Sequence, residues 1–213
     1  MTRAEDFYQR HFAAQTSHQE VYLRDRLPVY EKILAIAQEL HLRRLVDLGC
    51  ALGMLVELAN AAGLDAYWFD FPIGELMEYH RNLAHSQGKF IYGSLADKSL
   101  RQSFQDKDID AFIILDTLRY LTEPQSLASL NAKYIIIKDL CDNYFIRRKG
   151  RNQRQAVDLR YYRPLDCLKL FHNYAAHRLY PSKFLFSLNN PGYLALALIN
   201  AISPTYTLIL KHK

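Results

Sequence analysis

The feature that most constrains the fold is a short apolar stretch that runs directly into a turn of small residues. Residues 45–54 read Leu-Val-Asp-Leu-Gly-Cys-Ala-Leu-Gly-Met, which predicts a buried strand, a tight turn and the start of a helix. Gly49 permits a sharp turn and a close approach of the backbone to a ligand, and Gly53 lets the helix pack closely on the strand. The helix N-terminus presents free N–H groups that favour the negative end of a ligand. We therefore expect a ligand to lie at this turn.

Further apolar runs follow, and helical patterns separate them. The segments that predict further strands of one sheet are 66–70, 89–92, 110–115 and 133–137. Strands that alternate with helices predict a doubly wound α/β fold with a mostly parallel sheet, because right-handed crossovers place helices on both faces. Two later segments, 178–186 and 204–210, bring the expected number of strands to seven.

The length of 213 residues indicates one domain over 1–213 with three regions. Residues 1–42 predict an N-terminal helical cap, with helices over 4–15 and 19–41, the second kinked or restarted at Pro28. Residues 43–140 form the expected ligand-binding core. Residues 141–213 contain a basic loop and C-terminal elements on the substrate side, with helices expected over 164–175 and 191–201.

Composition narrows the function classes. The three cysteines form no Cys-x-x-Cys pair or Cys/His cluster, so neither a zinc site nor a disulfide framework is expected, and a reduced, cytoplasmic setting fits best. No segment is typical of a signal peptide or a membrane span. Residues 1–140 carry 15 basic and 19 acidic side chains, whereas the remaining residues carry 12 basic and 3 acidic ones. An anionic partner should therefore meet the C-terminal third.

Two acids at strand ends indicate the kind of ligand. Asp47 lies beneath the turn and can accept from a ligand ammonium group, whereas Asp70 ends the second strand and can accept from both hydroxyls of a ribose. Together they describe a nucleoside joined to an amino acid. A nicotinamide cofactor fits less well, because the turn lacks the Gly-x-Gly-x-x-Gly fingerprint. The alternatives are simple strand–helix packing at the turn and a solvated acid at Asp70.

The segment from Val46 to Lys138 resembles the core of class I S-adenosylmethionine-dependent methyltransferases. Residues 46–53 are similar to the first motif of that family, with alanine in place of its middle glycine. The resemblance implies S-adenosyl-L-methionine as the cofactor, and Asp70 takes the place of the ribose-binding acid with Phe71 against the adenine. It also implies that the last strands of the sheet run antiparallel. The cofactor-binding residues implied at the first two strands are Asp47, Gly49, Cys50, Ala51, Gly53, Asp70 and Phe71.

Two later motifs extend the resemblance. Residues 93–97 fall where the family has Gly-Asp-Ala-x-Asp, and Ser94 replaces the usual acid beside Leu95. Residues 110–121 follow the family's fourth-strand pattern, with Leu115 at the strand end and Tyr120 in place of the usual histidine. The resemblance thus adds Ser94, Leu95 and Leu115 to the expected cofactor-binding residues.

The acceptor of the methyl group is indicated by charge. The loop over 147–163 is rich in arginine, whose forked side chain suits phosphate or carboxylate. We therefore expect a small anionic metabolite as the substrate, bound by His11, Arg147, Arg148 and Arg151. Tyr120 and His172 are the candidate catalytic residues, and no metal is expected. The alternatives are an RNA or DNA methyltransferase that uses the basic loop, a non-catalytic binding subunit with this fold, and a loop that is merely solvated.

Overall fold

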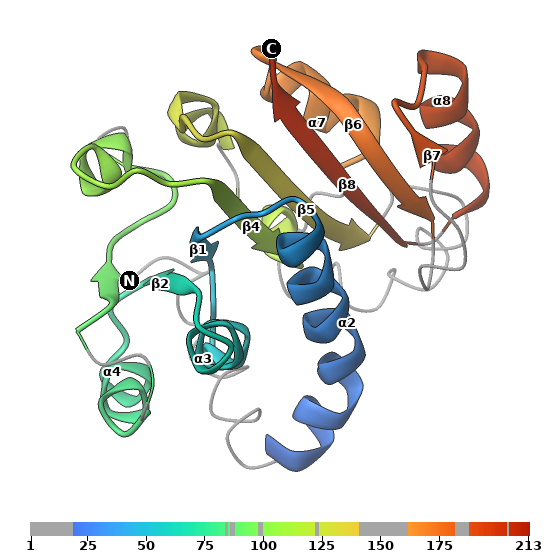
Figure 1. Ribbon diagram of the computed structural model, residues 1–213. Helices are drawn as coiled ribbons and strands as arrows, with labels where there is room; N and C mark the ends of the chain where they lie inside the picture. Colours follow the sequence, from blue (N-terminus) through green and yellow to red (C-terminus); the bar gives the residue numbers. More distant parts are fainter. Residues whose placement is uncertain are drawn as a thin grey trace. The chain divides into compact units, whose positions relative to one another are not determined.

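In the computed structural model, the chain divides into two compact units, one that ends at Gly93 and one that begins at Ser94 (Figure 1). The described residues are 19–83, 85, 88–97, 100–121, 124–140, 162–181, 188–203 and 205–213. The predicted helix over 4–15 lies outside them. Each unit combines strands and helices, so the predicted α/β fold class is confirmed.

The first unit has three parallel strands in the order β3-β2-β1. Its elements are α2 (Gln19–Glu39), β1 (Arg44–Leu48), α3 (Met54–Ala61), β2 (Asp65–Asp70), α4 (Gly74–Arg81) and β3 (Phe90–Tyr92). The predicted strands are confirmed within about one residue. Helix α2 continues through Pro28, so no new helix starts there. Helix α4 ends at Arg81, and His80 and Arg81 lie in its last turn.

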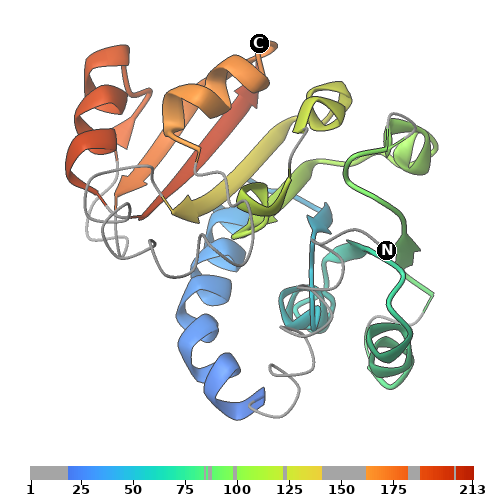
Figure 2. The same cartoon turned by 180° about the vertical axis from the view of Figure 1, so that it is seen from behind.

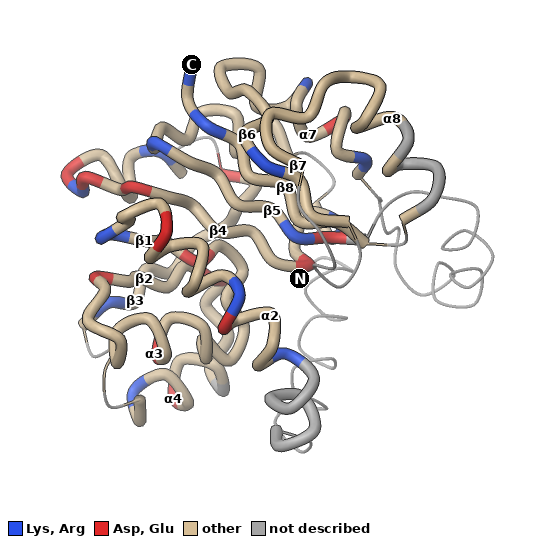
Figure 3. The backbone as a smooth tube through the Cα atoms, turned by 45° about the vertical axis from the view of Figure 1, so that its right-hand side comes forward, with Lys and Arg blue, Asp and Glu red and all other residues tan. Residues whose placement is uncertain are grey.

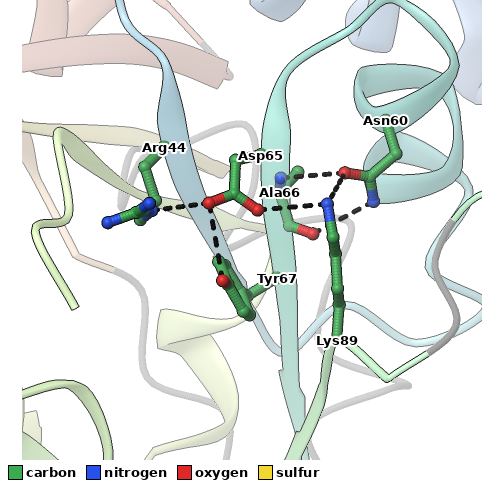
Figure 4. Close-up of polar contacts among 6 residues, drawn as sticks. All are labelled: Arg44, Asn60, Asp65, Ala66, Tyr67 and Lys89. Atoms are coloured by element: carbon green, nitrogen blue, oxygen red, sulfur yellow. Dashed lines mark hydrogen bonds and ion pairs between the residues drawn. The ribbon is translucent and has the colours of Figure 1, made fainter. Parts of the chain in front are cut away.

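A polar network joins the amino ends of the three strands of the first unit (Figure 4). The Arg44 and Asp65 side chains, on directly paired residues of β1 and β2, are 2.6 Å apart between Nε and Oδ2. The Lys89 ammonium group is 3.1 Å from the other carboxylate oxygen of Asp65 and donates to Asn60 Oδ1 at 2.8 Å. These cations hold the pKa of Asp65 below its usual value despite partial burial. The network therefore helps to set the register of β1, β2 and β3.

The second unit has β4 and β5 parallel, followed by antiparallel pairs in the order β5-β8-β6-β7 (Figures 1 and 2). Its strands are β4 (Ala111–Leu115), β5 (Tyr134–Leu140), β6 (Tyr174–Pro181), β7 (Leu188–Asn189) and β8 (Thr205–His212). Its helices are η1 (Leu100–Phe104), η2 (Leu118–Tyr120), η3 (Pro124–Ser129), α7 (Pro164–Leu170) and α8 (Tyr193–Ile202). The apolar runs of β4, β5 and β8 are buried on both faces, as their sequences predict. The antiparallel pairing of the last strands is also as predicted.

The helix predicted over 164–175 is too long. Helix α7 ends at Leu170, and β6 begins at Tyr174, because residues 174–181 pair with β8 instead of continuing the helix. The Tyr174 hydroxyl donates to the Ala132 carbonyl at 2.9 Å and accepts from the Ala132 amide at 3.0 Å, which anchors the start of β6 to the segment that precedes β5. The short β7, which the sequence did not predict, brings the strands of the described residues to eight rather than seven.

We predict that Asp65→Asn lowers the free energy of unfolding by about 0.5–1 kcal/mol, because a partly exposed carboxylate with two cations is lost. Urea denaturation at pH 7 measures the change. Asp106→Asn is the matched control, since that exposed acid should change stability by less than about 0.5 kcal/mol. Equal effects of the two substitutions would contradict a role for the network.

Candidate ligand site at the ends of strands β1 and β2

The turn after β1 is built from backbone conformations that most residues avoid. Gly49, Ala51 and Gly53 have φ angles of 78°, 49° and 67°, all in the left-handed region. The Gly49 amide donates to the Phe69 carbonyl at 2.8 Å, and the Gly53 amide donates to the Cys50 carbonyl at 2.8 Å. Alanine at position 51 adopts this conformation at a cost of roughly 1–2 kcal/mol, which something nearby must offset.

The start of α3 packs directly on β2. Gly53 precedes the helix, and a Cβ atom at this position would overlap the ring of Trp68, a buried residue of β2. The sequence predicted this close packing of helix on strand. It brings the backbone of the turn against the carboxyl end of β2.

Asp70 holds the turn from the end of β2. Its Oδ2 accepts from the Ala51 amide at 2.7 Å, and its Oδ1 accepts from the Phe71 amide at 2.7 Å. The Cys50 thiol lies 3.8 Å from Oδ2. Hydrogen bonds to a charged acceptor contribute about 1.5–3 kcal/mol, enough to offset the left-handed backbone at Ala51. Asp70 is therefore buried and contacts the turn, which excludes the alternative of a solvated acid.

Asp47 is buried, and few hydrogen bonds compensate for the loss of its contact with water. Its side chain is 4% exposed, and its Oδ1 has no hydrogen-bond partner among the residues that the structure describes. Burial first, and then the neighbouring Asp70 carboxylate, raise the pKa of Asp47 to about 8. Burial also raises the pKa of the Cys50 thiol well above its usual value, with both acids adding to the effect. In the ligand-free protein Asp47 is thus a neutral acid at pH 7.

A buried histidine supports the turn from the other side. His80 is 0% exposed on α4, and its Nε2 lies 2.9 Å from the Ala51 carbonyl oxygen. Since a carbonyl only accepts, Nε2 carries the hydrogen, and Nδ1 then accepts from the Tyr92 hydroxyl at 3.3 Å. The ring stacks on Phe90 and meets Trp68 edge-on, and burial lowers the pKa of His80 to about 4.

The sequence did not single out His80 or Tyr92. His80 lies four residues after Leu76, and this spacing places it on the apolar face of α4, where a histidine usually belongs to the core. That spacing was the only sequence signal for His80. Its hydrogen bond to the Ala51 carbonyl is visible only in the folded structure.

An apolar surface adjoins the turn. Leu52, Ile73 and Leu76 form a buried cluster, and four partly buried side chains pack against it. These four are Ala51, Met54, Phe71 and Tyr79. The predicted ligand residue Phe71 therefore lies next to the turn, in a setting that suits a flat apolar group.

In the second unit, ion pairs connect the carboxyl ends of β4 and β5. Asp116 follows β4 with a φ of 55° and binds Arg119 and, at 2.6 Å, the Lys138 ammonium group. Arg119 Nε is also 3.1 Å from Oδ1 of the buried Asp139. The Tyr120 ring, a predicted catalytic group, lies 5.8 Å from the Arg119 guanidinium carbon. Two cations and two carboxylates thus balance each other here.

The remaining predicted site residues have simpler settings. Ser94 Oγ accepts from the Ala96 amide at 3.2 Å, and the Leu95 carbonyl accepts from the Ser126 hydroxyl. Leu115 is the last residue of β4, and His172 is exposed between α7 and β6. The predicted substrate-binding residues His11, Arg147, Arg148 and Arg151 lie outside the described residues.

Over the described part of the chain, basic residues are spread along the strands of the second unit (Figure 3). No group of three or more histidine, cysteine or acidic side chains there is arranged to hold a metal ion. No described helix is both long and apolar enough to cross a bilayer.

Sequence comparison matched no family model and no curated protein. Solved structures match closely in fold at low identity. A methyltransferase from Haloferax volcanii in complex with the Trm112 activator has a TM-score of 0.64 at 12% identity, covering 94% of this chain and 97% of its own. An Archaeoglobus fulgidus S-adenosylmethionine-dependent methyltransferase has a TM-score of 0.56 at 14% identity, covering 90% and 99%. The Synechocystis magnesium protoporphyrin IX methyltransferase with bound S-adenosylhomocysteine has a TM-score of 0.56 at 17% identity, covering 87% and 82%.

The chain has the fold of class I S-adenosylmethionine-dependent methyltransferases. The fold that the sequence motifs implied is confirmed. These structures belong to differently named methyltransferases, so the likeness establishes the architecture and leaves the acceptor open.

We predict that Gly53→Ala destabilises the protein by about 3 kcal/mol or more, because the added methyl group overlaps the Trp68 ring and the left-handed backbone is strained. Gly63→Ala is the matched control: its φ is 84°, but a Cβ atom there meets open space, so only about 1–2 kcal/mol should be lost. Chemical denaturation measures both. Equal losses would show that the Trp68 contact is unimportant.

We also predict that Asp47→Asn stabilises the ligand-free protein more as pH rises. The pKa of Asp47 is about 8 in the folded protein and near 4 when unfolded. Below pH 4 both states hold the proton, whereas between pH 4 and 8 only the folded state does, which lowers the stability of the wild type by up to about 1.4 kcal/mol per pH unit. Asparagine has no proton to lose.

Urea unfolding at pH 5 and pH 8 measures this effect. The stability gained by Asp47→Asn should be larger at pH 8 by on the order of 2–4 kcal/mol. The same gain at both values would mean that Asp47 is ionised in the folded protein.

Proposed function

We propose that the protein is an S-adenosylmethionine-dependent methyltransferase that acts on a small anionic metabolite. The observation that supports this cofactor is the buried carboxyl group of Asp47, just before the tight turn. Its Oδ1 has no hydrogen-bond partner among the described residues. A buried polar atom without a partner is costly, and a ligand ammonium group would satisfy it. The methyltransferase fold of the chain supports the same ligand.

The residues around the turn fit the rest of this cofactor. Asp47 would hold the ammonium group of the methionine part, and the backbone from Gly49 to Gly53 would approach its carboxylate. Asp70 would hold the ribose. Its oxygens already accept from two backbone amides, and because a carboxylate has about four lone-pair sites, a ribose hydroxyl group would share this acceptor with them. Phe71 and the adjoining apolar cluster would pack against the adenine.

The motif positions of this fold extend the assignment to three further residues. We assign Ser94, Leu95 and Leu115 to the adenosine side of the cofactor, on the motif positions that they occupy. When bound, the cofactor supplies a methyl group on a reactive sulfonium, so the protein mainly needs to align the acceptor. Tyr120, whose ring adjoins Arg119, and His172 are the proposed orienting groups for that acceptor.

The proposed acceptor is anionic because of the charge of the C-terminal third. The excess of 12 basic over 3 acidic side chains after residue 140 favours a phosphate- or carboxylate-bearing substrate. Arg147, Arg148 and Arg151 are the proposed contacts, with His11 as a further one.

Calorimetric titration of S-adenosylmethionine tests the proposal. We expect binding to the wild type and an affinity at least tenfold weaker for Asp70→Asn, because a hydrogen bond from a ribose hydroxyl to a charged acceptor contributes about 1.5–3 kcal/mol. Asp65→Asn is the matched control, since it changes the same residue type at the opposite end of β2 and should bind normally. Absence of binding to the wild type would refute the proposal of a methyltransferase and favour the alternative of a non-catalytic binding subunit.

A further inference from the structure

The two acids at the turn occupy different chemical states. Asp70 accepts two short backbone hydrogen bonds, an arrangement that favours its charged form. Asp47 is equally buried, but its Oδ1 receives no donor within the described residues, and the Asp70 charge opposes a second one beside it. A carboxyl group in this position is more stable with its proton.

We propose that the ligand's ammonium group displaces a proton from Asp47 on binding, so that the affinity of the site for S-adenosylmethionine rises with pH. This inference rests on the proposed cofactor and adds a proton to the binding reaction. It predicts that the ligand-free site is neutral at Asp47 and becomes an ion pair only in the complex.

The step balances in atoms and charge. The ligand arrives as an ammonium ion with all of its own protons. The O–H bond of the Asp47 carboxyl group breaks, its electron pair stays on oxygen, and the proton leaves to solvent. The new contact is N⁺–H···O⁻, and one proton is released for each ligand bound.

The other titratable groups around Asp47 do not compete for this role. On the turn, the Cys50 thiol keeps its proton because its pKa is raised well above the usual value. On α4, His80 is neutral above about pH 4, and on β3 the Tyr92 hydroxyl has a raised pKa that Arg81 only partly offsets. Asp70 already accepts from amides. Between pH 5 and 8, Asp47 is therefore the group that exchanges a proton.

The consequence is a steep dependence of affinity on pH. Below the pKa of Asp47, about 8, the free protein must give up its proton for the ligand to bind. The dissociation constant then falls up to tenfold for each pH unit gained, by the linkage between proton and ligand binding. A ligand α-amino group loses its own proton near pH 8, so affinity should level off there.

The experiment is calorimetric titration with S-adenosylhomocysteine between pH 6 and 7.5, in two buffers of different ionisation enthalpy. This probe has the ammonium group but no sulfonium charge. We expect nearly one proton released per ligand at pH 7, and a dissociation constant that falls roughly 20-fold from pH 6 to 7.5. 5′-Methylthioadenosine, which lacks the amino-acid tail, should bind without proton release.

Two variants complete the design. Asp47→Asn should bind S-adenosylhomocysteine without proton release and with little dependence on pH, whereas Asp65→Asn should behave as the wild type. Wild-type binding that is independent of pH and releases no proton would overturn this inference and leave the cofactor proposal intact. Equal proton release by methylthioadenosine would also overturn it. No binding of either probe at any pH would instead refute the proposed cofactor.

Discussion

The hydrogen bonds from the Ala51 and Phe71 amides to Asp70 are the interactions on which the site depends. The bond from Ala51 ties the turn after β1 to the end of β2 and stabilises a left-handed alanine where the related motif has glycine, and the bond from Phe71 orients the Asp70 carboxylate. The contact of Gly53 with Trp68 and the hydrogen bond of His80 to Ala51 then hold the same turn from two other directions. A turn fixed on three sides is preorganised, so the proposed ligand would bind there with little loss of the protein's conformational freedom.

This rigidity has a thermodynamic consequence at Asp47. The groups that fix the turn also bury the acid beneath it, and the Asp70 charge raises its pKa further. An uncharged residue at this position would make the folded protein more stable, whereas an acid there would bind a cationic ligand more tightly. Such conflicts between stability and binding are typical of functional sites, where a strained or unsatisfied group remains because the ligand satisfies it.

The predictable part of the fold was the part in which local pattern and tertiary structure agree. Buried apolar runs predicted β4 and β5, and the Gly-rich turn predicted the entry to α3. The prediction failed at residues 171–175, where a helical spacing of apolar residues was overridden by pairing with β8. The positions of Asp47 and Asp70 near strand ends followed from the sequence. The hydrogen bond of His80 and the ion pairs of Arg119 join segments that no local sequence pattern connects.

Two acids of the first unit have opposite environments, although each lies near the end of a strand. Asp65 lies at the amino end of β2, where Arg44 and Lys89 pair with it and lower its pKa. Asp47 lies at the carboxyl end of β1, three residues after Arg44, and its pKa is raised instead. Both residues are aspartates near the end of a parallel strand. The opposite shifts of their pKa values therefore follow from their surroundings: Asp65 has two cations beside it, whereas Asp47 is buried next to the Asp70 carboxylate. Where the protein provides the cation, the acid fixes strand register; where it provides none, as at Asp47, we propose that a ligand brings the cation.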